Sequence, residues 1–335
     1  MAFSLKKYNT FGLDAFARQF MEIESEDIFY ELIGNEGYKQ SRKFIIGGGS
    51  NVFFENGHFD GIILHPVMKG IEIIETEDNN VIIRCAAGEN WKDFVDMTVA
   101  RGWYGLENLS DIPGNVGAAP VQNVGAYGME AKDCISKVYA INIENGEKKC
   151  FKKPECEFGY RTSIFKNAAM KNMLIYSVEF ILKKNSTLRL DYGNIRSYLS
   201  EKNILNPTIS DVAQAVKDIR ASKLPQVGIV GSAGSFFKNA VVPKAKYEQL
   251  KSEYPEMPGF EGENGYVKIP TGWLIEKAGL KGYRDGDAGV WSKQALILVN
   301  HGTAMGTDIK RVMQKVISEV EDKFGIKIEP EVVIV

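Results

Sequence analysis

The chain has 335 residues, enough for two or three domains of ordinary size. Its formal net charge is −2, so it lacks the basic excess that holds a nucleic-acid backbone. No apolar run is long enough to span a bilayer, and the N-terminal residues lack the apolar core of a signal peptide. We therefore expect a cytoplasmic globular protein that binds neither nucleic acid nor a membrane.

The cysteines are the next feature that limits function. None of the four belongs to a CxxC pair: Cys85, Cys134, Cys150 and Cys156. Free thiols in a reducing compartment are therefore expected, rather than disulfides or a metal site.

The first part of the chain has the pattern of short strands separated by tight turns. A helix should begin after Asn90, a suitable cap, and end at Gly102. Its buried face would carry Trp91, Phe94, Val95 and Val99. This alternation indicates an α+β fold rather than a regular parallel array of strands and helices. Strands are expected at 43–46, 52–54, 61–64, 71–74 and 81–85.

Two glycine-rich segments interrupt these strands. Residues 47–51, Gly-Gly-Gly-Ser-Asn, offer consecutive backbone N–H groups that suit a pyrophosphate. Alone, such a segment is more often an ordinary turn. It is not a Rossmann fingerprint, because no helix comes after it. Residues 103–130 are also rich in glycine and small side chains, with little volume for a core of their own. Two such segments in one domain favour a dinucleotide bound between them.

Later elements divide the chain further. Strands are expected at 137–143 and 173–182, and a helix at 209–222 with Ser210 as its cap. A compact α+β unit follows Lys223-Leu-Pro225, with helices at 271–278 and 308–324 and strands at 295–300 and 326–335. We place one domain boundary near residue 223 and a softer one near residue 68.

The segment from Gly231 to Asn239 is the most informative of the chain. It places Ser235 in a glycine-spaced turn, with Lys238 and Asn239 close by as donors. The three histidines of the chain, His58, His65 and His301, lack the spacing of a base motif. A serine without such a base is more plausible as a proton donor than as a nucleophile.

Other single residues carry weaker signals. Arg161 follows an aromatic residue and suits a carboxylate or phosphate, although an arginine is more often a solvated surface charge. If the last strand is buried, Glu331 needs a partner there, since a buried unpaired carboxylate is costly. Taken alone, three further residues read as a linker charge, a loop aromatic and a strand-edge amide: Lys223, Tyr192 and Gln294.

Together the motifs resemble the UDP-N-acetylenolpyruvoylglucosamine reductases, flavoenzymes of bacterial peptidoglycan precursor synthesis. The resemblance runs from Asn9 to Val332, and the segments around Tyr160 and Tyr192 resemble the longer of two family types. Its motifs are residues 9–13, 47–51, 87–91, 105–109, 112–117, 122–128, 160–161, 223–225, 234–239 and 329–332.

The resemblance implies an α+β fold with an FAD-binding part of the vanillyl-alcohol-oxidase type in two subdomains, and a C-terminal substrate domain. The implied domains are 1–68, 69–222 and 223–325, with 326–335 returning to the first. The implied FAD contacts are Gly47, Gly48, Gly49, Ser50, Asn51, Ile112, Pro113, Gly114, Val116, Gly117, Gln122, Asn123, Gly125, Ala126 and Tyr127.

The resemblance also implies the reaction, the NADPH-dependent reduction of UDP-N-acetylglucosamine enolpyruvate to UDP-N-acetylmuramate through FAD. Hydride would add at C3 of the enol ether and Ser235 would protonate C2, while Arg161 and Glu331 take the other two catalytic positions. The positions implied around the substrate or NADPH are Tyr160, Tyr192, Lys223, Asn239 and Gln294. Val333 stands where the family commonly has an arginine, which puts one substrate or nucleotide contact in doubt.

Two other functions stay open on the residues alone. One is a flavin oxidase that turns over a sugar alcohol with oxygen; the other is a UDP-sugar-binding module without catalysis. The balanced charge and the lack of an exposed heptad pattern favour a monomer.

Overall fold

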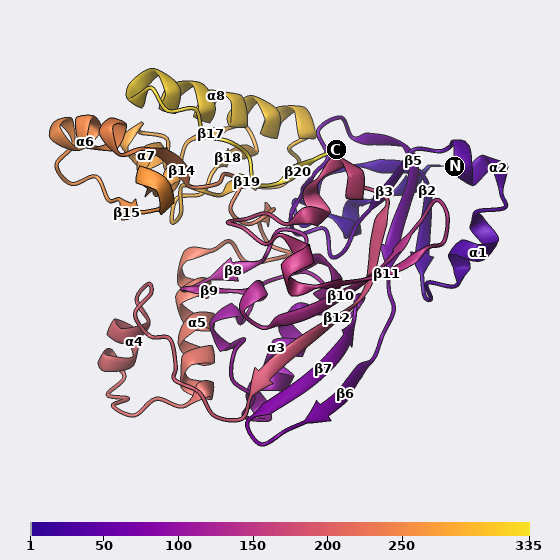
Figure 1. Cartoon of the computed structure of the whole chain (residues 1–335). Helices are drawn as coiled ribbons and strands as arrows, with labels where there is room; N and C mark the ends of the chain where they lie inside the picture. Colours follow the sequence, from indigo (N-terminus) through magenta and orange to yellow (C-terminus); the bar gives the residue numbers. More distant parts are fainter. Residues whose placement is uncertain (1) are drawn as a thin grey trace. The chain divides into compact units, whose positions relative to one another are not determined.

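The computed structural model describes residues 2–335 (Figure 1). Their contacts group into two compact units. The first unit comprises residues 2–17, Gly49–Phe59 and Lys223–Val335, and the second comprises Arg18–Gly48 and Asp60–Ser222. The chain passes between units inside β2 (Phe16–Ile23) and β5 (His58–Pro66). The division into three domains stays a prediction.

The second unit is built on a five-stranded antiparallel sheet of order β11-β10-β12-β7-β6 (Figure 1). Residues of β7 alternate between buried and half-buried, as expected for a strand with one face on a core. The helix α3 (Trp91–Ala100) covers that face, and the side chain of Asn90 caps it by accepting a hydrogen bond from the Asp93 N–H at 3.2 Å. The strand bounds are β6 Ile71–Thr76, β7 Asn80–Ala86, β10 Ile135–Asn142, β11 Lys148–Lys152 and β12 Met173–Lys183.

The parallel pair β3 (Lys43–Ile45) and β5 precedes this sheet in the chain. Two short helices, α1 (Ile28–Leu32) and α2 (Glu36–Gln40), pack with these strands in a separate apolar cluster. The remaining strands of this unit are β8 Gly125–Ala126 and β9 Met129–Glu130, while β1 (Phe3–Ser4) belongs to the first unit.

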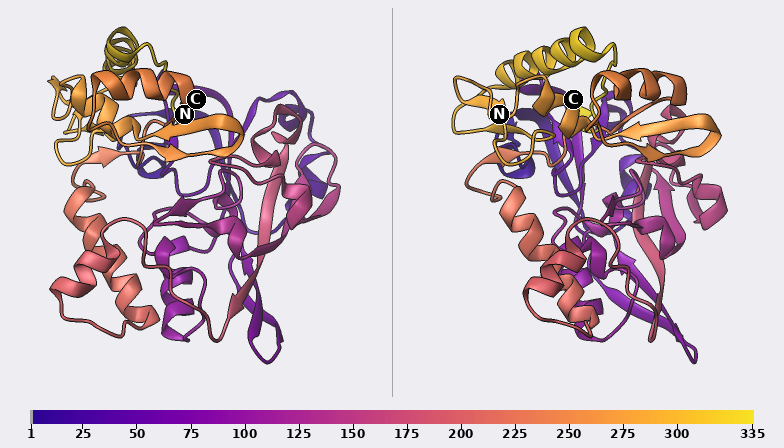
Figure 2. Two further views of the ribbon diagram at one scale, coloured as in Figure 1. Left: turned by 60° about the vertical axis from the view of Figure 1, so that its left-hand side comes forward. Right: turned by 90° about the vertical axis from the view of Figure 1, so that its left-hand side faces the viewer.

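Two neighbouring helices, α4 (Ile195–Glu201) and α5 (Ile209–Lys223), form a small cluster of their own (Figure 2). The predicted cap of α5 at Ser210 is wrong. Asp211 accepts a hydrogen bond from the Thr208 N–H at 2.8 Å, and Thr208 Oγ1 accepts one from the Asp211 N–H at 3.3 Å. This reciprocal pair satisfies donors at the start of the helix, so that the helix starts after Thr208 and includes Ser210.

The first unit holds two small antiparallel sheets and the long helix α8 (Gly306–Phe324), coloured yellow in Figures 1 and 2. As predicted, α8 buries Ile309, Val312, Val316 and Val320, and it ends at Gly325 with a φ of 61°. The sheets contain β13 Gly231–Ser232, β17 Arg284–Asp285, β18 Ala288–Val290 and β19 Leu298–Asn300, and β14 Ala240–Pro243, β15 Phe260–Glu261 and β16 Tyr266–Ile269. The shorter helices are α6 Lys244–Glu253 and α7 Thr271–Lys277.

The C-terminal segment is only partly a strand, in contrast to the strand predicted over 326–335. Ile326 and Ile328 are buried while Lys327 is exposed, which produces the alternation of a strand without a paired neighbour. Only β20 (Val333–Ile334) forms a ladder, in parallel with β4 (Val52–Phe53). Pro330, which has no N–H donor, lies in the segment before that ladder.

The described residues contain no helix both long and apolar enough to cross a membrane. Cys85, Cys134, Cys150 and Cys156 are all free thiols, as predicted. Burial raises the pKa of Cys134 to about 12, with the Glu107 carboxylate adding to the shift. Among residues 2–335, no group of His, Cys, Asp and Glu side chains is arranged to hold a metal ion.

Candidate active site

The turn that carries Ser235 is fixed to the N-terminal segment of the first unit. The Ser232 N–H donates to the Thr10 carbonyl at 3.0 Å, and Thr10 Oγ1 donates to the Ser232 carbonyl at 2.5 Å. A Cβ on Gly231 would collide with the Phe11 carbonyl oxygen, and Gly234 has a φ of 69°. The glycines thus permit a tight turn, and Ser235 is exposed on it.

The residues after Ser235 run antiparallel to the segment that carries Glu331. The Glu331 N–H donates to the Phe236 carbonyl at 2.7 Å, and the Lys238 N–H donates to the Glu329 carbonyl at 3.0 Å. Phe237 therefore lies opposite Pro330, and Glu331 opposite the residue that follows Ser235. The structure brings two of the three predicted catalytic positions onto neighbouring extended segments of one unit.

Two buried aromatic residues anchor this pair of segments. The Phe236 ring lies 5.7 Å from the Phe53 ring and 6.1 Å from the Phe11 ring, between centroids. The Phe237 ring is also buried, 5.1 Å from the Phe236 ring. Because large buried rings leave little freedom, they hold the backbone next to Ser235 in one position.

Asn239 and Gln294 both lie at the start of α7. Asn239 Oδ1 accepts a hydrogen bond from the Thr271 N–H at 3.1 Å, which caps the helix from outside its own sequence. Gln294 Oε1 lies 2.9 Å from where a Cβ on Gly272 would stand, and it accepts from the Leu296 N–H at 3.4 Å. Both amide oxygens are thus used within the protein, while both amide NH₂ groups remain donors for a ligand.

Lys223 is the first residue of the unit's long C-terminal part and the last residue of α5. Its carbonyl accepts a hydrogen bond from the Trp291 indole Nε1 at 2.9 Å. The backbone of Lys223 is therefore fixed, while its side chain is half-buried.

In the second unit the two glycine-rich segments contact each other. A Cβ on Gly48 would stand 2.8 Å from Asn115 Oδ1 and 2.9 Å from Gly114 Cα, so only glycine allows this approach. The 112–117 loop is held in turn by the segment before α3, since the Gly117 N–H donates to the Ala87 carbonyl at 3.0 Å. Gly47, Gly48 and the loop from Ile112 to Gly117 therefore form one backbone surface.

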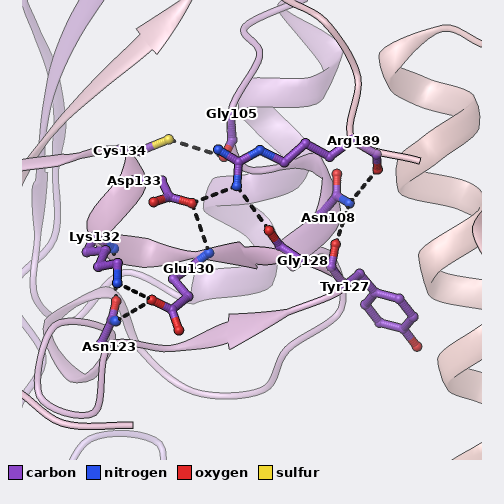
Figure 3. Close-up of polar contacts among 10 residues, drawn as sticks. All are labelled: Gly105, Asn108, Asn123, Tyr127, Gly128, Glu130, Lys132, Asp133, Cys134 and Arg189. Atoms are coloured by element: carbon purple, nitrogen blue, oxygen red, sulfur yellow. Dashed lines mark hydrogen bonds and ion pairs between the residues drawn. The ribbon is translucent and has the colours of Figure 1, made fainter. Parts of the chain in front are cut away.

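The next predicted FAD segment, 122–127, is organised by the buried Asn123. Its Nδ2 donates to Glu130 Oε2 at 2.9 Å (Figure 3). The same Nδ2 donates to the Gly159 carbonyl at 3.0 Å. Asn123 and Tyr127 both have positive φ, 49° and 48°. Such conformations cost free energy in non-glycine residues and are often found at functional sites.

Arg161 lies at the second position of a two-residue turn between Gly159 and Thr162. Its φ is 54°, in a region where this turn position usually holds glycine or asparagine. Arg161 Nη2 donates to the Gly125 carbonyl at 2.6 Å, and its guanidinium carbon lies 5.5 Å from the centre of the Tyr160 ring. The predicted catalytic arginine therefore contacts the predicted flavin loop directly.

Tyr192 is half exposed and lies against the same loop. Its Cβ is 3.0 Å from where a Cβ on Gly128 would stand, and a Cβ on Gly193 would lie 3.1 Å from Tyr127 Cδ1. The Tyr192 segment therefore packs on the last two residues of the 122–128 stretch.

Three polar groups near these loops were not predicted from the sequence. Arg220 Nε donates to the Asp111 carbonyl at 3.2 Å; burial lowers the pKa of Arg220, while Tyr127 and Asp111 oppose that shift. Asn108 Oδ1 and Ser110 Oγ are buried without a hydrogen-bond partner among the described residues. Unpartnered buried polar atoms are costly, so a bound polar group or ordered water is expected beside them. In the sequence, these three residues are marked only by lying within or near the motifs at 105–109 and 223–225.

Two protein families match separate parts of the chain. A UDP-N-acetylenolpyruvoylglucosamine reductase C-terminal domain matches residues 225–335, and an FAD binding domain matches residues 38–149. A UDP-N-acetylenolpyruvoylglucosamine reductase from Flavobacterium johnsoniae is 48% identical over 98% of this chain and 97% of its own. The chain belongs to the UDP-N-acetylenolpyruvoylglucosamine reductase family.

Further relatives of this reductase family agree. The Chromobacterium violaceum reductase is 44% identical over 98% of this chain and 96% of its own, and the Bacteroides fragilis reductase is 44% identical over 98% of both. A crystal structure of the Thermus caldophilus enzyme covers 100% of this chain and 98% of its own, with a TM-score of 0.70 and 20% identity. That structure supports the fold alone.

Membership of the reductase family confirms the predicted α+β flavoprotein fold, the oxidoreductase class and the cofactors FAD and NADPH. It also places the enzyme in peptidoglycan precursor synthesis. The residues predicted for FAD, substrate and catalysis stay predictions, as does assignment to the longer family type.

The donor set around the two loops predicted to bind FAD fits the cofactor. Gly48 and Gly114 approach each other closely, Arg220 supplies a half-buried cation, and Asn108 and Ser110 supply polar atoms without a hydrogen-bond partner among the described residues. An FAD molecule carries a pyrophosphate, hydroxyl groups and a ring edge that bind such groups.

Proposed function

We propose that this protein reduces UDP-N-acetylglucosamine enolpyruvate to UDP-N-acetylmuramate with electrons from NADPH. The main support is the identity of 41–48% over nearly the whole chain to reductases of that name. The backbone pairing of the segment after Ser235 with the segment around Glu331 supports the same proposal, because the two segments are neighbours within one unit.

The proposed FAD contacts are the backbone groups of residues 47–51 and 112–117, and the residues from Gln122 to Tyr127. Arg220 is added as a cation for a phosphate or another electron-rich group. These residues would hold the flavin, which would supply the hydride transfer from NADPH to the vinyl carbon C3 of the substrate.

Arg161 stabilises the negative charge that then builds up on C2 and the substrate carboxylate. A guanidinium suits this role because it is always charged and binds carboxylates in two-point fashion. Its bond to the Gly125 carbonyl and its turn geometry fix its direction before the substrate arrives. The guanidinium of Arg161 then needs no reorientation during the reaction.

Ser235 donates its proton to C2, which completes the saturated product. A hydroxyl is a weak acid, so this step requires the strongly basic carbanion-like centre that the hydride addition creates. Glu331, on the neighbouring extended segment, orients the Ser235 hydroxyl or shares a proton with the enolate-like intermediate. Tyr160, Tyr192, Lys223, Asn239 and Gln294 bind the substrate or NADPH.

The first experiment is a visible absorption spectrum of the purified protein under anaerobic conditions. NADPH should bleach the flavin band, and UDP-N-acetylglucosamine enolpyruvate should restore it with formation of UDP-N-acetylmuramate. A band that returns only with oxygen would support a flavin oxidase instead. Tight binding of the UDP-sugar by a chain that takes up no flavin would support a binding module.

A reaction that consumes NADPH and a uridine-nucleotide sugar fits the cytoplasm, and we propose that compartment. The monomer and the absence of nucleic-acid partners stay predictions. Val333 pairs its backbone with Val52, and its half-exposed side chain is apolar where the family commonly has a cation. We therefore propose that the substrate or nucleotide contact of that position is missing.

A further inference from the structure

A small polar network joins the Tyr192 segment to the proposed flavin loop (Figure 3). We propose that Arg189 is a positioning residue, which fixes the Tyr192 segment on Tyr127–Gly128 and stabilises both for their ligands. The inference rests on the proposed function for the role of Tyr192 in substrate binding. We call the five residues Asn108, Tyr127, Gly128, Asp133 and Arg189 the clamp.

The side chain of Arg189 holds the flavin loop from one side. Its Nη1 donates to the Gly128 carbonyl at 3.0 Å and lies 2.8 Å from Asp133 Oδ2 (Figure 3). Asp133 Oδ2 also accepts a hydrogen bond from the Glu130 N–H at 3.3 Å. The guanidinium therefore bridges the end of the 122–128 loop and the turn that follows it.

The backbone of Arg189 is held by a second, independent contact. Asn108 Nδ2 donates to the Arg189 carbonyl and to the Tyr127 carbonyl, both at 2.9 Å. The Asn108 side chain is buried, so these bonds are shielded from water. One amide group thus ties the flavin loop to the segment three residues before Tyr192.

The packing shows what the clamp positions. The Tyr192 Cβ lies 3.0 Å from where a Cβ on Gly128 would stand. The carbonyl of this same Gly128 accepts the hydrogen bond from Arg189. Residues 184–194 contain no helix or strand up to α4, so few other backbone bonds fix Tyr192. Removing the Arg189 bonds would therefore let Tyr192 leave the loop and would let Gly128 move.

The clamp predicts effects on two ligands from one residue. Loss of Arg189 should raise the KM for the enolpyruvyl substrate through Tyr192, with little change in kcat. It should also speed the release of FAD through Gly128 and Tyr127. The FAD effect does not depend on Tyr192, whereas the KM effect does.

The test compares Arg189→Met, Arg189→Lys and Tyr192→Ala as full-chain holoenzymes, alone and combined. In Arg189→Met we expect a rise of about threefold in KM and in the rate of FAD release after dilution, read by flavin fluorescence. Arg189→Lys should recover most of the wild-type KM and most of the wild-type rate of FAD release. The bonds to Gly128 and Asp133 both come from Nη1, and one ammonium group can make them. In the Tyr192→Ala background, Arg189→Met should leave KM unchanged and still speed FAD release.

Arg311→Met is the matched control. Arg311 is similarly exposed and also pairs with carboxylates, Asp285 and Asp308, but on α8. It should change neither readout. An Arg189 effect on KM that persists in full without Tyr192, or normal FAD release in Arg189→Met, would overturn the proposal. If the wild-type holoenzyme fails to reduce the substrate, the proposed function fails, and FAD release alone decides on the clamp.

Discussion

Arg161 Nη2 lies 2.6 Å from the carbonyl oxygen of Gly125, and this bond joins a proposed catalytic side chain to a proposed flavin loop within one unit. Glycine at the acceptor leaves room for this approach, because a Cβ there would stand 2.8 Å from Arg161 Nη1. The arginine itself adopts a φ of 54°, which an L-residue rarely does. Position and direction of the guanidinium are therefore set before any substrate binds.

Arg161→Ala should slow mainly the reoxidation of reduced enzyme by substrate, by about 10²–10³-fold, as expected for loss of a preorganised charge. Reduction by NADPH should stay within a few-fold of wild type. Anaerobic stopped-flow absorbance of each half-reaction measures both rates. Free guanidinium added to the variant should restore part of the reoxidation rate, while normal reoxidation without it would remove Arg161 from the mechanism.

Ser235→Ala should leave flavin reduction nearly intact and slow reoxidation by about 10²–10⁴-fold, the usual range for a lost general acid. The same stopped-flow experiment separates the two halves. Ser232→Ala is the control, since Ser232 lies in the same turn and bonds to Thr10 through its backbone. Equal losses in both half-reactions of Ser235→Ala would indicate a structural role instead.

Asn239 offers a way to separate helix capping from ligand binding. Asn239→Ala should lower stability by about 1 kcal/mol, because Thr271 loses the acceptor for its N–H. Asn239→Asp keeps that acceptor and should keep the thermal midpoint, yet it lacks the amide donor and should raise KM about tenfold. If Asn239→Ala unfolds early and both variants keep a normal KM, Asn239 serves α7 alone.

Local signals predicted much of the fold. The helix α3 shows both its cap at Asn90 and its apolar period in the sequence, and α8 shows its period and its terminal Gly325. The strand expected over 326–335 failed because burial of Ile326 and Ile328 gives the period of a strand without a ladder. Whether an extended segment pairs depends on its neighbours in space, which the period alone does not contain.

The proposed site, like the fold, was predicted only in part from the sequence. Ser235 and Gly48 lie in motifs whose composition marks them, and glycine spacing predicts a close backbone approach at Gly48. Arg189, Asn108 and Arg220 were missed, since their importance arises from side chains that reach residues 19 to 109 positions away. No local pattern marks such contacts.

Gly48→Ala should loosen the contact between the two glycine segments. The added methyl would stand within 3 Å of Gly114 Cα and Asn115 Oδ1, so we expect a loss of about 1–3 kcal/mol of stability and faster FAD release. Gly34→Ala is the control, because its Cβ would meet only the Glu31 carbonyl at 3.5 Å. Thermal unfolding and flavin fluorescence after dilution measure the two effects. Wild-type flavin retention in Gly48→Ala would exclude this backbone approach as a flavin requirement.

The buried Glu179 should make the stability of the second unit depend on pH in acid. Burial raises its pKa, but the hydrogen bonds from Lys137 and Ser136 outweigh burial and hold the pKa below its usual range. Because the pKa of Glu179 is lower in the folded than in the unfolded protein, the ionised carboxylate stabilises the fold. This stabilisation is complete above the unfolded pKa of about 4.3 and is lost as the pH falls through the folded pKa. Glu179→Gln should therefore lower the thermal midpoint most at pH 7, and the gap to wild type should narrow towards about pH 3. Glu319→Gln, which removes an exposed partner of Lys315 on α8, should show a small effect at pH 7. A gap for Glu179→Gln that stays constant from pH 7 to pH 3 would show that packing, rather than the carboxylate charge, carries its contribution.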